Sequence, residues 1–148
     1  MITYQIEKDI TITEFKALLE KSTLAERRPI NEPERLAKML EHGNLIVTAR
    51  DHGQLVGIAR SITDFVYCTY LSDLAVDVAY QKQGIGNFLL ISVETKFKEL
   101  NINEYELDVE SINHNAIAFY YKQGFIVHNK YRLGGQTKLL LKKTIYGK

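Results

Sequence analysis

The chain has a single cysteine, Cys68, among its 148 residues. Because a disulfide needs two cysteines and a cysteine-based metal cluster needs several, the sequence excludes both within one chain. The scarcity of cysteine favours a reducing, cytoplasmic environment. The four histidines have no metal-binding spacing. We therefore expect no metal site.

Net charge is also nearly absent, since 19 lysines and arginines face 18 aspartates and glutamates and leave a formal charge of +1. No overall field draws the protein to nucleic acid or to an anionic membrane, so an anion site would have to be local. No apolar run approaches the roughly 18 residues of a membrane span, and the N-terminus lacks the apolar core of a signal peptide. We expect a cytoplasmic protein that binds neither nucleic acid nor membrane.

Proline occurs only at Pro29 and Pro33, and the chain has no low-complexity linker and no repeat. Its composition, 45% hydrophobic and 25% charged, is typical of a globular protein. We expect a single domain over residues 1–148.

Strand-like patterns occur in both halves of the chain. The stretches predicted as strands or hairpins are residues 2–7, 44–61, 66–76, 125–130 and 136–143. The hairpin turns at His52 and Gly53. A further strand has one apolar face and an acidic face of Glu104, Glu106, Asp108 and Glu110.

Helical spacing occurs in four stretches. The first has Phe15, Leu18 and Leu19 on one face, and the second is predicted to begin with a capping box of Asn31 and Glu34. The third begins after Gly84 and runs for about four turns. Its predicted apolar face is Ile85, Phe88, Leu89, Val93, Phe97 and Leu100. A short fourth helix ends before Gly124.

The order β-α-α-β-β-β-α-β-α-β-β predicts an α/β fold. Its mixed sheet would be largely antiparallel, with about seven strands, about four helices and one parallel step across the long helix.

The stretch "QKQGIGN" stands between a strand and the long helix. The first amides of a helix have no internal partner and carry partial positive charge, and glycine lets a phosphate approach the backbone closely. With Lys82 nearby, the stretch favours a diphosphate site. The alternative is that Gly84 and Gly86 serve only the turn and helix packing.

Two familiar phosphate loops do not fit this stretch. A P-loop needs Gly-Lys-Ser/Thr, which is absent, and the dinucleotide fingerprint needs a third glycine where Leu89 stands.

A third pattern does fit: "LAVDVAYQKQGIGNFLL" resembles motif A of the GNAT superfamily of acetyl-CoA-dependent N-acetyltransferases, and "LDVESINHNAIAFYYKQGF" is similar to the family's motif B region. The matching positions are Gln81, Gly84 and Gly86 in the first segment and Asn113, Ala116, Tyr120, Gly124 and Phe125 in the second. The resemblance extends over nearly the whole chain and implies splayed central strands.

The resemblance implies acetyl-CoA as cofactor and CoA as product. Backbone groups of Leu74 and Val76 would hold pantetheine, and the Leu74 amide would stabilise the oxyanion of a tetrahedral intermediate. Asn113 would bond to the pantetheine arm, and Tyr120 would stand near the sulfur. The implied pyrophosphate segment consists of Gln81, Lys82, Gln83, Gly84, Ile85, Gly86 and Asn87.

Acetyl transfer from a thioester to an amine needs an acid and a base. Tyr120 is predicted to protonate the leaving thiolate, because the ordinary pKa of a tyrosine, about 10, suits donation to a thiolate. The alternative for Tyr120 is an amphipathic core residue. Asp108 occupies the place of the family's proposed glutamate base and would act directly, through a water, or by attracting a cationic amine. Asp73 is a rival, and either carboxylate could instead be an ordinary strand residue.

The acceptor is expected to be a small-molecule or peptide amine, with Phe65, Tyr67 and Tyr70 either lining its pocket or packing on the sheet. Cys68 is expected to be buried and not a nucleophile. A non-catalytic acyl-CoA-binding regulatory module is the alternative function, and the protein could be a monomer or a homodimer.

Overall fold

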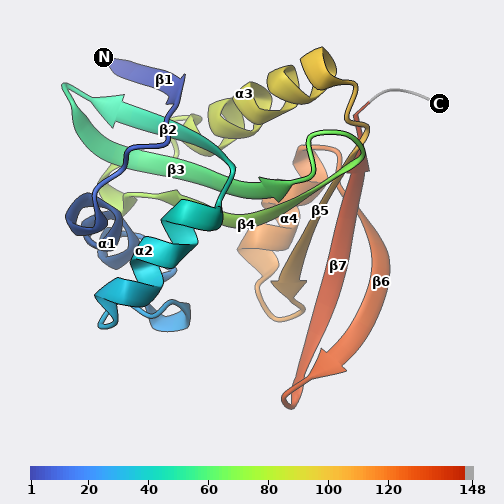
Figure 1. Ribbon diagram of the computed structural model, residues 1–148. Coiled ribbons are helices and arrows are strands. Elements are labelled where there is room, and N and C mark those ends of the chain that lie inside the picture. Colours follow the sequence, from blue (N-terminus) through green and yellow to red (C-terminus); the bar gives the residue numbers. More distant parts are fainter. Residues whose placement is uncertain (146–148) are drawn as a thin grey trace. The chain divides into compact units, whose positions relative to one another are not determined.

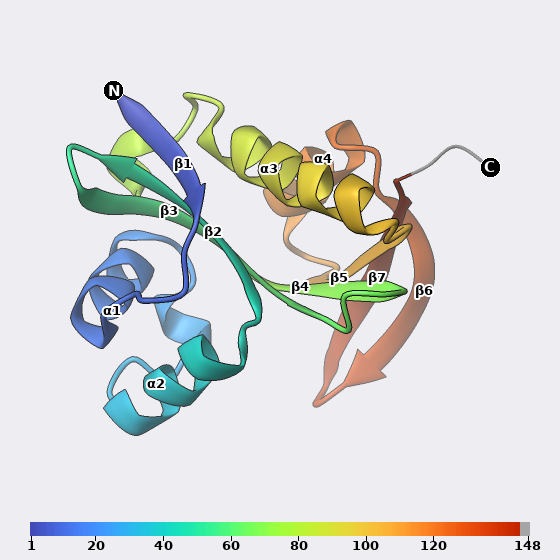
Figure 2. The same cartoon turned by 45° about the horizontal axis from the view of Figure 1, so that its top comes forward.

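The computed structural model describes residues 1–145 (Figures 1 and 2). The chain forms two compact units: unit 1 is Met1–Ile62 with Ser72–Lys96, and unit 2 is Thr63–Leu71 with the chain from Phe97 onward. The strands are β1 (Ile2–Ile6), β2 (Leu45–Asp51), β3 (Gln54–Thr63), β4 (Cys68–Val76), β5 (Glu104–Glu110), β6 (Ile126–Leu133) and β7 (Gln136–Thr144). The α-helices are α1 (Ile12–Lys21), α2 (Pro33–His42), α3 (Ile85–Leu100) and α4 (His114–Lys122), and the short 3₁₀ helices are η1 (Ala25–Arg27) and η2 (Val78–Tyr80).

The hydrogen-bonded strand order is β1-β2-β3-β4-β5-β7-β6. β4 and β5 pair in parallel, Cys68 to Tyr70 with Glu104 to Glu106, whereas β1-β2, β2-β3, β5-β7 and β6-β7 pair antiparallel. The predicted fold class is therefore confirmed, and a parallel step lies between β4 and β5, across the long helix α3. The single domain and the splaying of the central strands stay predictions.

Unit 1 has helices on both faces of its strands (Figure 2). On one face, the core cluster joins α1 and α2 to the strands through Ile10, Phe15, Leu18, Leu19, Leu36, Leu40, Ile46, Leu55, Ile58 and Ala75. On the other face, the start of α3 packs closely on β3 at Gly57. A Cβ there would lie 3.1 Å from Ile85 Cγ2 and 3.2 Å from Leu89 Cδ1, so the bare backbone allows the helix to approach.

The start of α2 differs from the prediction. The helix begins at Pro33, but its N-cap is Glu32, whose side chain makes no capping hydrogen bond in the described part of the chain. The capping box of Asn31 and Glu34 is wrong, because proline in the first helical position fixes the preceding residue as the cap. The capping box that does exist begins α1, where Thr11 and Glu14 bond to each other's backbone amides.

One residue of the predicted apolar face of α3 is also misplaced. Phe88 is 52% exposed and its ring lies 5.5 Å from that of Tyr4, whereas Leu90 is fully buried. Because α3 has apolar residues over a broad part of its surface, helical spacing alone did not show which apolar residue lies at the exposed edge.

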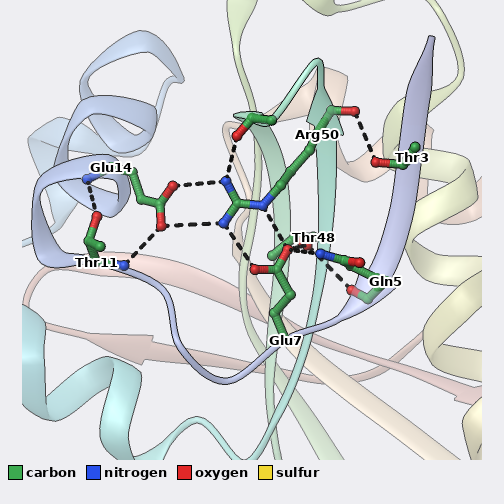
Figure 3. Close-up of polar contacts among 8 residues, drawn as sticks. Thr3, Gln5, Glu7, Thr11, Glu14, Thr48 and Arg50 are labelled. Atoms are coloured by element: carbon green, nitrogen blue, oxygen red, sulfur yellow. Dashed lines mark hydrogen bonds and ion pairs between the residues drawn. The ribbon is translucent and has the colours of Figure 1, made fainter.

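Arg50 of β2 joins β2 to Glu7, which follows β1, and to Glu14 of α1 (Figure 3). Its Nε donates to Glu7 Oε2 at 2.8 Å and its Nη1 to Glu14 Oε1 at 2.9 Å, and the Thr48 hydroxyl also donates to Glu7. Hydrogen bonding from Arg50 is the main cause that lowers the pKa of Glu7 from 4.5 to about 2. The pKa of Glu14 is lowered by the same guanidinium.

This network predicts acid sensitivity. A carboxyl whose pKa is depressed in the folded state stabilises the fold above its unfolded value of 4.5, and this stabilisation is lost as the pH falls towards about 2. We expect Glu7→Gln to lower the free energy of unfolding at pH 7 and to flatten its decline between pH 4.5 and pH 2, measured by urea unfolding. Glu20→Gln, at an exposed position of α1, is the control; an equal effect of both substitutions would contradict the assignment.

Unit 2 contains the β5, β7 and β6 strands side by side, together with α4 (Figure 1). The predicted alternation of β5 is confirmed, since Tyr105, Leu107 and Val109 are buried and the intervening acidic residues are half-buried. The Tyr105 ring lies 4.8 Å from that of Phe97 and 5.7 Å from that of Phe125. One face of β5 therefore packs into an aromatic core, and the other presents carboxylates.

Candidate functional site

The glycine-containing turn before α3 adopts a backbone that depends on Gly84. Lys82 has φ +64° and Gly84 φ +82°, and the Gly84 carbonyl accepts from the Phe88 amide at 3.0 Å, which begins the helix. A Cβ at Gly84 would meet nothing within 4 Å. The glycine is therefore favoured by its left-handed conformation and not by crowding.

Three side chains fix the approach to this turn. Asp77 accepts from the Ala79 amide at 2.9 Å, and the Tyr80 hydroxyl donates to Asp51 Oδ2 at 2.7 Å. Gln81 Nε2 donates to the Val76 carbonyl at 3.3 Å. The segment Gln81 to Gly84 is itself exposed, Gly86 and Asn87 are half-buried, and Ile85 is buried. Ile85 could therefore meet a ligand only through its backbone.

Leu74 and Val76 lie on one face of β4. Both are half-buried, whereas Asp73 and Ala75 on the alternate face are buried and Ala75 belongs to the core of unit 1. Their predicted contacts to pantetheine stay predictions.

Asp73 forms a buried ion-pair network. Its Oδ1 accepts from Arg28 Nε at 2.6 Å and its Oδ2 from Arg60 Nε, while both arginines also donate to Ser72. Arg60 Nη1 reaches the Met39 carbonyl of α2 at 3.0 Å. Because the Asp73 side chain is fully buried and held by two guanidinium groups, the arrangement favours a structural role over that of a base.

Asn113 and Tyr120 lie at opposite ends of α4. Asn113 is the N-cap, its Oδ1 accepting from the Ala116 amide at 3.2 Å, and Gly124 follows the helix with φ +97° as predicted. The Tyr120 ring lies 5.2 Å from that of Phe119 and 5.5 Å from that of Phe125. Tyr120 is thus associated with the aromatic face of β5.

Asp108 accepts two tyrosine hydrogen bonds. Tyr70 donates to Oδ2 and Tyr131 to Oδ1, each at 2.7 Å. The bond to the carboxylate raises the pKa of Tyr131, with burial adding to the rise. Sequence reasoning missed Tyr131, because it stands 23 residues from Asp108 and no local pattern marks the contact.

The acidic face of β5 is partly neutralised. Lys142 Nζ lies 3.1 Å from Glu104 and 4.0 Å from Glu106, and the bond to Glu104 is the main cause that raises the pKa of Lys142. Asp108 instead has Leu140 opposite it on β7. The carboxylates of this strand therefore differ in their partners.

Cys68 is exposed, so the prediction that it is buried is wrong. The buried positions at this end of β4 are Thr69 and Leu71, which places Cys68 on the other face. Partial desolvation of the thiol, followed by the charges of Asp64, Glu106 and Glu104, raises its pKa, which supports the prediction that it is not a nucleophile. In the preceding loop, Phe65 and Tyr67 are 42% and 64% exposed.

Within residues 1–145, no helix has the length and apolar character needed to cross a membrane. Over the same residues, no group of three metal-ligating side chains is placed to hold a metal ion.

Comparisons with known proteins place this geometry in context. Residues 12–125, more than half of the chain, match the family described as Acetyltransferase (GNAT) family. The Bacillus subtilis (strain 168) protein described as "Uncharacterized protein YxbD" is 33% identical over 75 residues, which are 51% of this chain and 45% of that protein. The chain spans about half the length of the curated relatives it matches.

Solved structures share the fold. The ribosomal-protein-S18-alanine N-acetyltransferase from Escherichia coli superposes with a TM-score of 0.82 at 19% identity, over 100% of this chain and 96% of that one. An aminoglycoside 6'-N-acetyltransferase complexed with coenzyme A gives a TM-score of 0.79 at 18% identity, over 100% of this chain and 98% of that one.

Proposed function

Since the chain belongs to the Acetyltransferase (GNAT) family, we propose that it transfers an acetyl group from acetyl-CoA to a primary amine by direct attack in a ternary complex. The observation that carries the proposal is the exposed turn at the start of α3, where Gly84 has a left-handed backbone and the first helical amides follow. Such amides bind phosphate oxygens. The segment from Gln81 to Asn87 would hold the pyrophosphate of the cofactor, with Lys82 as the adjacent cation.

In the proposed reaction, the amine nitrogen forms a bond to the thioester carbonyl carbon and the carbon–sulfur bond then breaks. An amine that is protonated at neutral pH first releases one proton to water, because only the neutral nitrogen can attack. The attacking nitrogen then loses a second proton, to Asp108 or to a water, and the departing CoA thiolate gains one. The products are the acetylated amine, CoA and one released proton. We assign the thiolate's proton to the Tyr120 hydroxyl and the oxyanion to the Leu74 amide. The backbone of Val76 and the side chain of Asn113 would contact the pantetheine arm.

The two faces of β5 support separate tasks for Tyr120 and Asp108. Tyr120 joins the aromatic face through Phe125, whereas Asp108 alternates with the buried residues and belongs to the other face. An acid for the leaving thiolate and a carboxylate for the incoming amine are both needed, and Tyr120 and Asp108 are two separate groups that could take these roles. We therefore assign Asp108 to the acceptor amine.

The acceptor would be a small-molecule amine or a peptide N-terminus. Among the neighbours of similar fold, one is named for a ribosomal-protein alanine and another for an aminoglycoside, so both kinds of amine are compatible with this architecture. The alternative, a regulatory module that binds acyl-CoA without turnover, shares the cofactor site but needs no proton transfer.

The proposal predicts stabilisation by acetyl-CoA together with amine-dependent release of free thiol. Ligand at about 100 times its Kd adds roughly 2.7 kcal/mol of stability, which raises Tm by about 5–10 °C for a chain of this size. Thermal unfolding with and without acetyl-CoA would be followed by an amine panel in the same samples. A Tm shift without thiol release from any amine would favour the regulatory module, and the absence of any shift at saturating ligand would contradict the cofactor site.

Two glycine substitutions provide a matched control. Gly84 and Gly134 both have positive φ and open space around a Cβ, so Gly84→Ala and Gly134→Ala impose a similar backbone strain of about 1–2 kcal/mol. Gly134 lies in the β6–β7 turn. Only Gly84→Ala should reduce the Tm shift produced by acetyl-CoA; equal reductions would argue against the phosphate-binding turn.

A further inference from the structure

Asp108 is the centre of a cluster drawn from three strands of unit 2. Tyr70 comes from β4, Asp108 from β5 and Tyr131 from β6, and the two hydroxyls bond to different oxygens of the carboxylate. All three side chains are partly accessible: Tyr70 is 37% exposed, and Asp108 and Tyr131 are half-buried. We call these residues the Tyr70–Asp108–Tyr131 cluster.

The carboxyl group of this cluster is bonded to hydroxyl groups and not to a cation within residues 1–145. In the described residues 1–145, the side-chain partners of Asp108 are the two tyrosine hydroxyls. Lys142, the cation on the neighbouring strand, pairs with Glu104 and Glu106 instead. Hydrogen bonds from neutral donors stabilise and orient a carboxylate while leaving its net charge available to a ligand.

The kinds of oxygen that the cluster brings together match a primary ammonium group. Each carboxylate oxygen accepts more than one hydrogen bond, and a tyrosine oxygen that donates its hydrogen can still accept. An alkylammonium ion brings a positive charge and three N–H donors, which a carboxylate and two phenol oxygens can satisfy together.

We propose that the Tyr70–Asp108–Tyr131 cluster binds the acceptor as its primary ammonium ion, with Asp108 as counter-ion and Tyr70 and Tyr131 as positioning residues. This inference rests on the proposed function, because it identifies the ligand as the acceptor of the acetyl group. It narrows the substrate class to aliphatic amines that are cationic at neutral pH, including an α-amino group. Acceptors with an uncharged nitrogen, such as anilines, would bind poorly.

Binding can be tested without turnover by NMR of protein labelled at the tyrosine ζ-carbons. The variants Tyr70→Phe and Tyr131→Phe identify the signals of the two tyrosines. We expect n-butylammonium chloride to shift both signals in a saturable way, whereas n-butanol, or potassium chloride at the same ionic strength, leaves them in place. Asp108→Asn should abolish the shift. Equal responses to n-butylammonium and n-butanol, or a response that survives Asp108→Asn, would overturn the proposal.

Steady-state kinetics then test the ammonium site separately from the proposed acetyl transfer. The assay uses the amine that gives the fastest thiol release. We expect Asp108→Asn to raise the KM for this acceptor by about tenfold or more, and the double variant Tyr70→Phe/Tyr131→Phe to raise it by several-fold. The KM for acetyl-CoA should change by less than about twofold in both variants. Tyr121→Phe, at a 50% exposed position of α4, is the matched control. Thiol release with an unchanged acceptor KM in these variants would refute the ammonium site while leaving the enzyme intact. Saturable binding of n-butylammonium without thiol release from any amine would instead refute the acetyl transfer.

Discussion

Replacing Tyr120 by phenylalanine is expected to lower the turnover of acetyl transfer by about 10²-fold or more while the Tm shift produced by acetyl-CoA stays nearly the same. The substitution keeps the ring that lies against Phe119 and Phe125 and removes the proton that the leaving thiolate needs. The measurement is initial-rate kinetics at saturating acetyl-CoA and amine, with thermal unfolding of the same preparations.

Tyr121→Phe is the matched control for this experiment, because Tyr121 is the adjacent residue of α4 and is 50% exposed. It should retain nearly full turnover. If Tyr120→Phe also retains full turnover, Tyr120 is not the acid and its role is that of an aromatic packing residue. If Tyr120→Phe loses the acetyl-CoA shift together with turnover, the hydroxyl serves binding rather than proton transfer.

The largest loss of stability is expected at Asp73. In Asp73→Asn, an amide nitrogen replaces one of the two oxygens that accept from Arg28 and Arg60. The N–H groups of the new amide then face the N–H groups of a guanidinium. The charge of Arg60, which is only 5% exposed, is also left unpaired in the interior. Breaking a buried ion pair by removing one partner costs roughly 3–5 kcal/mol. Urea unfolding at pH 7 measures the loss.

Two further variants show whether charge is the cause of this loss. Asp9→Asn, at an exposed position, should change the free energy of unfolding by less than about 0.5 kcal/mol. Asp73→Leu combined with Arg60→Met should be more stable than Asp73→Asn, because apolar replacement of both partners leaves no unpaired charge at Arg60. A double variant less stable than Asp73→Asn would point to the hydrogen bonds of Arg60 to Met39 and Ser72 as the larger contribution.

Local patterns were sufficient to predict the order of the elements. The alternation of β5, the His52-Gly53 hairpin and the helix after Gly84 are each encoded within a few residues, and the structure has all three. The predicted capping box failed for an equally local reason, since Pro33 moves the cap from Asn31 to Glu32.

The contacts that specialise the candidate site are long-range and could not be predicted in this way. Arg28 stands 45 residues from Asp73, and Tyr70 stands 38 residues from Asp108. Their meeting depends on strand order and register, which periodicity does not encode. For this reason the sequence identified Asp108 as the candidate base and left Asp73 as its rival, whereas the structure gives Asp73 two arginines and Asp108 two tyrosines.

The exposure of Cys68 bears on how turnover should be recorded. A colorimetric reagent that detects released CoA also reacts with accessible protein thiols, and this chain contributes one such group. Because its raised pKa leaves less thiolate at neutral pH, the protein's own signal should be a slow rise that stops at one equivalent per chain. Signal beyond that equivalent comes from CoA, and a Cys68→Ser variant would give a flat baseline against which even a slow acceptor can be recognised.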